Sequence, residues 1–217
     1  MNIILPAKNI RTKDFKIENG VLYLRHGQSF RNAIYSLTYF MKGRRFCYYC
    51  KKRVPRNEIT MDHMYPRSAG GPTIPENLIP ACAKCNSEKS DMTYEQYQTF
   101  LTLPTTSEKR EYLAGLSEYK DALKEVGMFE IPYTWITPVR ISDIHAEIDI
   151  ASISEAKFKK VKAHYKKHHN FQKPVVLDRN LCVLDGFHSI FAAKSCAIPV
   201  VPAIVLDNVE VRRSSKI

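Results

Sequence analysis

Two Cys-x-x-Cys pairs constrain this chain more than any other feature of its sequence. Cys47 and Cys50 form the first pair, and Cys82 and Cys85 form the second. Two residues between thiolates let a turn present both sulfurs to one ion, and a second such turn completes a tetrahedral sphere. The spacing therefore predicts a structural zinc site that draws residues 46–91 together. The redox alternative needs one such pair beside a βαβ pattern, which this part of the chain does not offer.

The composition limits the class of protein and its compartment. A hydrophobic fraction of 44% with 25% charged residues is typical of a soluble globular protein, and 217 residues suffice for one large or two small domains. No stretch approaches the roughly 20 apolar residues of a membrane helix, and Pro6 interrupts the N-terminus too early for a signal peptide. We therefore expect a cytoplasmic protein with no membrane partner, in which paired thiols bind metal rather than form disulfides.

Positive charge is concentrated at the N-terminal side. The net charge is +11, and residues 1–60 contain 13 Lys and Arg but 3 Asp and Glu. Such an asymmetry favours a polyanionic partner, DNA, and makes Arg44 and Arg45 candidate nucleic-acid contacts. A solvated basic surface without a partner is the alternative on charge alone.

The segment between and beside the cysteine pairs carries groups suited to phosphodiester hydrolysis. His63 can activate water near neutral pH, because the ordinary pKa of histidine is about 6.5. Asp62 and Asn86 offer oxygen ligands of the kind that magnesium and manganese prefer. One divalent ion can polarise a phosphoryl oxygen and stabilise the leaving alkoxide.

Residues 46–91 resemble the HNH endonucleases, whose site is a ββα-metal fold. The resemblance rests on Asp-His-x-x-Pro-x-Ser-x-Gly-Gly at 62–71, on Asn-Leu at 77–78, and on Cys-x-x-Cys-Asn-x-x-Lys at 82–89. It covers roughly a fifth of the chain, with its parts in the family's order.

The resemblance implies a role for each residue. His63 would be the general base, on the second strand of a hairpin, and Asp62 and Asn86 would hold the catalytic Mg or Mn, with Asn86 at the start of the helix. Asn77 would fix the backbone of His63, and Lys89 would face a phosphate one turn beyond Asn86. The alternative is a zinc-ordered DNA-binding knuckle without chemistry.

A second resemblance lies in the C-terminal part. Residues 138–208 look like the ParB/sulfiredoxin-like fold, in which Asp-Gly-x-His-Arg ends a strand and opens a helix whose N-terminus binds phosphate. Gly186 and His188 match and are candidate cofactor-binding residues, whereas Ser189 replaces the arginine and removes its bidentate phosphate contact. A rigid specificity or dimerisation module without chemistry is the alternative.

The pattern along the chain predicts an α+β protein. We expect a basic extension at 1–45, the nuclease core at 46–92, a helical segment at 93–130, a linker at 131–138 and the ParB/sulfiredoxin-like domain at 139–217. Apolar spacing and capping residues predict helices at 29–42, 94–101, 107–126, 154–169 and 187–195. Alternating or apolar runs predict strands at 14–24, with a turn at Asn19-Gly20, and at 139–144, 174–177, 182–184 and 200–206. In the third helix, an apolar stripe predicts core contacts for Tyr112, Leu116, Tyr119 and Leu123.

The sequence thus predicts a metal-dependent DNA endonuclease with a structural zinc, aided in binding or target choice by its C-terminal domain. A single site cuts one strand, so a monomer should nick, and a homodimer would supply two sites. Two alternatives remain: a non-catalytic zinc-containing DNA-binding or adaptor protein, and a nucleotide-binding activity of the C-terminal domain.

Overall fold

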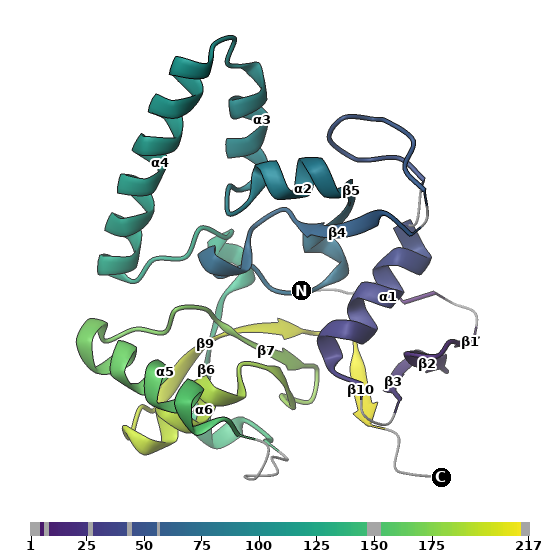
Figure 1. Cartoon of the computed structure of the whole chain (residues 1–217). Coiled ribbons are helices and arrows are strands. Elements are labelled where there is room, and N and C mark those ends of the chain that lie inside the picture. Colours follow the sequence, from purple (N-terminus) through teal and green to yellow (C-terminus); the bar gives the residue numbers. More distant parts are fainter. Residues whose placement is uncertain are drawn as a thin grey trace.

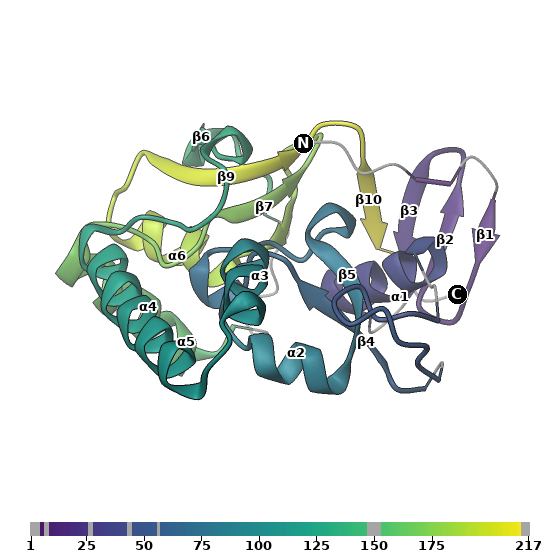
Figure 2. The same ribbon diagram turned by 90° about the horizontal axis from the view of Figure 1, so that it is seen from above.

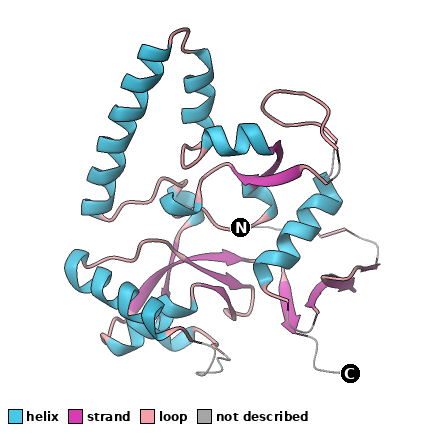
Figure 3. Cartoon of the chain, viewed as in Figure 1, coloured by secondary structure: helices cyan, strands magenta, loops and turns pink. Residues whose placement is uncertain are grey.

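The molecule combines three small sheets with helices packed around them. The structure is a computed structural model that describes residues 5–6, 9–25, 28–42, 45–55, 57–146 and 153–213. Helices and strands are mixed along the whole molecule (Figure 3), which agrees with the predicted α+β class.

The N-terminal sheet is built from both ends of the chain. Its order is β1-β2-β3-β10, and its strands are Ile10–Arg11, Phe15–Glu18, Val21–Leu24 and Glu210–Arg213. Asn19 and Gly20 both have positive φ, 51° and 74°, and so form the predicted tight turn between β2 and β3. The last strand, β10, lies parallel to β3 (Figure 2), so the C-terminal residues complete this sheet.

The central unit holds the segment with the cysteine pairs. Its elements are α1 (Phe30–Lys42), β4 (Ile59–His63), β5 (Leu78–Cys82) and α2 (Ala83–Lys89). β4 and β5 form an antiparallel pair, and the chain between them makes short 3₁₀ turns at Arg67–Ala69 and Pro75–Asn77. Ser29 accepts a hydrogen bond from the backbone N–H of Asn32, as expected for the predicted N-cap of α1.

Two helices project from the central unit (Figure 1). They are α3 (Tyr94–Thr102) and α4 (Thr106–Val126), and both begin with a capping box, at Thr93 and Thr105. The prediction that the apolar stripe of α4 is core holds in part: Tyr112 and Leu116 are half-buried against a core cluster, whereas Tyr119 is 50% exposed. Among the residues described, no helix combines the length and apolar character that crossing a membrane requires.

The C-terminal part forms a four-stranded mixed sheet with two helices. The strand order is β6-β9-β7-β8, and the elements are β6 (Thr137–Arg140), α5 (Glu155–His168), β7 (Val175–Asp178), β8 (Val183–Asp185), α6 (Phe187–Ser195) and β9 (Val200–Leu206). β7 and β9 are parallel, whereas β6 and β8 run antiparallel to their neighbours. The strand predicted at 139–144 begins earlier and ends at Arg140, after which Ile141–Asp143 is a 3₁₀ turn.

One hydrophobic core joins the N-terminal sheet, α1 and the C-terminal sheet. Leu22, Ile34, Val176 and Ile204 are buried in this same cluster. The segment expected as a linker, 131–138, contains a 3₁₀ turn and the start of β6. The shared cluster crosses the expected boundaries, whereas two further clusters of buried residues each lie within one part of the chain, at 47–100 and at 139–203.

Candidate active site and zinc centre

The four paired cysteines converge on one point. The sulfur atoms of Cys47, Cys50, Cys82 and Cys85 all lie within 4.8 Å of one another. A tetrahedral zinc ion about 2.3 Å from each sulfur needs sulfur–sulfur separations of about 3.8 Å. The four thiolates therefore fit a structural zinc ion and leave no position open for substrate. No other group of three or more metal-binding side chains gathers in the described ranges.

Backbone hydrogen bonds attach the first cysteine turn to the hairpin. Tyr48 N–H donates to the carbonyl oxygen of Pro80 on β5, at 2.8 Å. In the second turn, Cys85 N–H donates to the sulfur of Cys82, at 3.4 Å. Because Cys82 ends β5 and precedes α2, a metal ion held by the four cysteines would fix the angle between the hairpin and the helix.

Asp62 is buried between the first cysteine turn and α2. Its carboxylate accepts hydrogen bonds from the hydroxyl of Tyr49, at 2.5 Å, and from Nζ of Lys89, at 3.3 Å. The residue as a whole is only 5% exposed. Burial raises the pKa of Asp62, and the Tyr49 hydrogen bond and the Lys89 charge oppose that rise.

Lys89 lies on the inner face of α2, not on its outer face. Its ammonium is fully buried and donates to the carbonyl oxygen of His63, at 2.7 Å, as well as to Asp62. The expected phosphate contact of Lys89 is therefore wrong in this arrangement. The spacing from Asn86 places Lys89 on the same face of the helix, and that face packs against β4.

Asn86 points to the same side of the hairpin as Asp62. Its Nδ2 donates to the hydroxyl of Thr60, at 3.0 Å, and Thr60 lies two residues before Asp62 on β4. Alternate residues of a strand share a face, so α2 brings Asn86 to the Asp62 side. The Asn86 amide oxygen and the remaining lone pairs of the Asp62 carboxylate form a hard donor set that fits Mg²⁺ or Mn²⁺.

His63 ends β4, which is the first strand of the β4–β5 hairpin rather than the expected second one. Its Nε2 lies 3.0 Å from the hydroxyl of Thr73, and the ring of Tyr35 meets the imidazole edge-on with centroids 5.9 Å apart. The side chain is 9% exposed. Burial, followed by the charges of Arg67, Lys89 and Arg31, lowers the pKa of His63 to about 4.

Two arginines with exposed side chains, from different segments, thus lower the pKa of His63 through their charges. Arg67 begins the 3₁₀ turn after β4, and Arg31 lies one helical turn before Tyr35 on α1. Both charges also act on Tyr35. Sequence reasoning gave no role to Arg67, Tyr35, Tyr49 or Thr73, because their contacts join segments that no local pattern connects.

Asn77 organises the loop that returns from β4 to β5. The side chain is fully buried, accepts from the N–H of Tyr65 at 2.8 Å and donates to the carbonyl oxygens of Tyr65 and Pro72, both at 2.9 Å. The loop is tight at Gly71, where a Cβ would lie 1.8 Å from the Tyr65 carbonyl oxygen. Asn77 thus holds the backbone immediately after His63.

The predicted cofactor-binding residues Gly186 and His188 lie at the start of α6. Gly186 has φ +94°, and a Cβ there would lie 2.8 Å from the side chain of Val175, so packing alone accounts for the glycine. Nε2 of His188 is buried and has no hydrogen-bond partner among the residues described. Burial lowers the pKa of His188, with Lys157 and Lys173 adding to the effect.

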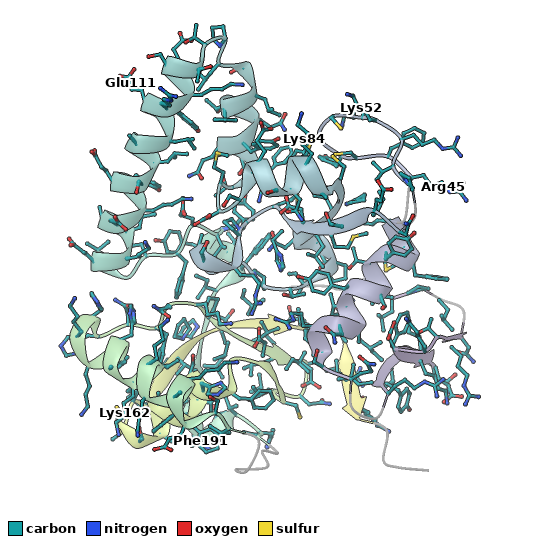
Figure 4. All side chains as sticks on the ribbon, viewed as in Figure 1. Arg45, Lys52, Lys84, Glu111, Lys162 and Phe191 are labelled. Atoms are coloured by element: carbon teal, nitrogen blue, oxygen red, sulfur yellow. The ribbon has the colours of Figure 1, made fainter. Side chains whose placement is uncertain are left out.

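Of the two arginines predicted to contact nucleic acid, Arg45 is among the described residues and Arg44 is not. Arg45 is exposed, and Figure 4 shows it projecting outward on the same side of the molecule as Lys52 and Lys84. Lys162 lies at the opposite, C-terminal end.

Comparison with known proteins identifies one part of the chain. Residues 47–100 match a family model described as HNH endonuclease. A search of curated proteins found no match. The match covers about a quarter of the chain and includes both cysteine pairs, Asp62, His63 and Asn86. The segment that gathers the four thiolates and carries these polar residues is thus similar to HNH endonuclease domains.

Proposed function

We propose that the chain is a metal-dependent DNA endonuclease that hydrolyses phosphodiester bonds. The main support is that the segment matching the HNH family also carries a complete set of reacting groups at one end of its hairpin. Asp62 and Asn86 share the face of β4 toward α2, and His63, the next residue, lies on the other face at the end of the strand, against Thr73 and Tyr35. The four-thiolate zinc would hold this hairpin in place without taking part in the reaction.

In this proposal His63 is the general base. Its lowered pKa, about 4, keeps the imidazole neutral and able to accept a proton at neutral pH. When Nε2 carries the proton and donates to Thr73, the other ring nitrogen holds the lone pair. That nitrogen takes a proton from water as the water oxygen attacks phosphorus. The bond from phosphorus to the 3′-oxygen breaks, and the leaving alkoxide takes a proton from solvent.

Asp62 and Asn86 would hold the divalent cation, magnesium or manganese. When bound, the cation polarises a phosphate oxygen and stabilises the leaving alkoxide. Tyr49 and Lys89 orient the Asp62 carboxylate by donating to it. Asn77 would keep the backbone after His63 in position.

Arg31 and Arg67 would bind the phosphate on the His63 side. Both are exposed, and both act electrostatically on His63. An arginine guanidinium can donate two parallel hydrogen bonds to phosphate oxygens. These two arginines would thus make the phosphate contact that the HNH resemblance implies for Lys89.

The number of active sites decides how many DNA strands are cut. One site of this kind cuts one strand, so a monomer nicks, and a homodimer brings two sites to a duplex. We propose that residues 139–217 aid DNA binding or target choice through the lysines of α5, among them Lys159, which is 72% exposed on its side chain.

A nicking assay on supercoiled plasmid tests this function. With magnesium or manganese, the wild-type protein should convert supercoiled DNA to open circles, and His63→Ala should lose that activity while still binding the plasmid. Lys84→Ala, an exposed change on α2, is the matched control. Equal products from wild type and His63→Ala with both metals would rule out the nuclease proposal.

A non-catalytic zinc DNA-binding protein is the second candidate function. The observation that favours it is the ion pair of Lys89 with Asp62, which neutralises the carboxylate without any bound cation. Under this alternative, plasmid binding persists and both metals fail to produce open circles.

A further inference from the structure

An open groove leads away from the His63 end of the hairpin. It has a volume of about 750 Å³ and lies between the turn before β2, one face of α1 and the outer side of β4. Tyr35 and Met61 are in its wall. Tyr35 meets the ring of His63 edge-on, and Met61 lies two residues before His63 on the same face of β4. One end of the groove is therefore next to the proposed base.

The groove combines aromatic rings with positive charge. Phe40 is 57% exposed, and Lys13 and Arg45 in the same wall are exposed cations. The acid in the wall, Asp14, already accepts a hydrogen bond from the hydroxyl of Ser36, at 2.5 Å. Aromatic side chains beside a positive groove are the arrangement by which proteins hold single-stranded nucleic acid, with bases stacked on rings and phosphates near cations.

Helix α1, which carries Tyr35 and Phe40, is held firmly against the segment that matches the HNH family, residues 47–100, called the HNH unit below. Ile34 and Leu37 of α1 are fully buried in a cluster with Leu78 of β5. At the end of α1, Nζ of Lys42 donates to the carbonyl oxygens of Leu78, at 3.0 Å, and of Pro75. A strand bound along α1 would therefore keep a constant position relative to His63.

We propose that this groove binds a single strand of DNA, stacks a base on Phe40 and guides the strand toward His63. The groove uses α1 and the N-terminal sheet, both of which lie outside the residues that match the HNH family. The guiding role depends on the proposed nuclease function, whereas binding of the strand does not.

Binding of DNA to the zinc-loaded His63→Ala chain tests the groove without cleavage. A labelled strand of about 16 nucleotides spans the longest single-strand sites of small binding domains and can be compared with its duplex by fluorescence anisotropy. We expect tighter binding of the single strand. Phe40→Ala should weaken it about tenfold, and Arg45→Gln should reduce the slope of log affinity against log salt by about 0.7.

Two exposed residues outside the groove serve as matched controls. Tyr119→Ala removes an aromatic ring that is 50% exposed on α4, and Lys166→Gln removes an exposed cation on α5. Both should bind the strand like their parent. Equal affinity for duplex and single strand, or equal losses in Phe40→Ala and Tyr119→Ala, would overturn the groove proposal. Failure of the plasmid assay would reject the nuclease while leaving strand binding to be judged by these measurements.

Discussion

The HNH site and the start of α6 both place an aspartate, a histidine and a lysine close together, but they differ in burial. Lys89 and Asp62 are 0% and 6% exposed on their side chains, whereas Lys173 and Asp185 are 34% and 41% exposed and 3.7 Å apart. At the HNH site, polar groups from four segments meet. At α6, the glycine packs against Val175 and the histidine nitrogen has no described partner. The two regions that resemble known families thus differ in how many distant segments supply partners to the same polar groups.

The largest expected difference between the two regions is their dependence on metal. Cys85→Ser should remove the zinc and unfold the HNH unit, because structural zinc contributes about 10–16 kcal/mol in small zinc domains. Cys196→Ser, outside the cluster, should leave the metal content unchanged. Elemental analysis should find about one zinc per wild-type chain and none in Cys85→Ser. Zinc retained in that variant would contradict the four-thiolate site.

Histidine substitutions compare the two regions in catalysis. His63→Ala should lower the nicking rate by about 10²- to 10⁴-fold, the usual contribution of a general base. His188→Ala should change the rate little, since that nitrogen is enclosed at α6. Single-turnover nicking rates give the comparison. A comparable loss of nicking rate in His188→Ala would instead indicate that the C-terminal part takes part in catalysis.

The two lysine–aspartate pairs should differ in their effect on stability. Lys89→Met leaves the Asp62 carboxylate buried without its counter-ion and should lower the free energy of unfolding by about 3–5 kcal/mol. Lys173→Met breaks a solvated pair and should cost about 1 kcal/mol or less. Urea unfolding measures both. Combining Lys89→Met with Asp62→Asn should restore part of the loss, and no recovery would contradict the charge argument.

The pH dependence of stability gives the smallest expected effect. As pH falls, the unfolded chain protonates His63 near its ordinary pKa of 6.5, but the folded protein does not until about 4. The unfolded state binds more protons in this window, so stability falls as pH decreases through it. Between pH 7 and pH 5 this histidine should account for about 2 kcal/mol. Urea unfolding of His63→Gln should show a correspondingly flatter pH dependence than that of the wild-type protein.

Local patterns predicted the zinc ligands and most helices. Cysteine spacing is a short-range constraint, and the N-cap at Ser29 and the capping box at Thr105 depend on neighbouring residues. Lys89 was predicted wrongly because its spacing from Asn86 gives a shared helix face without saying whether that face packs inward. The stripe on α4 was predicted as core, but only Tyr112 and Leu116 pack against a core cluster, and Tyr119 stays exposed. These errors have one cause, which is that burial is decided by distant segments.

The pairing of β10 with β3 has a consequence for the order of folding. Residues 21–24 and 210–213 are separated by most of the chain, so their contact closes a long loop and carries a high entropic cost. Contacts of this kind form slowly, after local helices and hairpins. During synthesis, β3 gains its parallel neighbour only after residues 25–209 have emerged. The segment with the cysteine pairs, and the groove walls at residues 12–61, can therefore form while the N-terminal sheet still lacks β10, and completion of that sheet becomes a late event in the maturation of the protein.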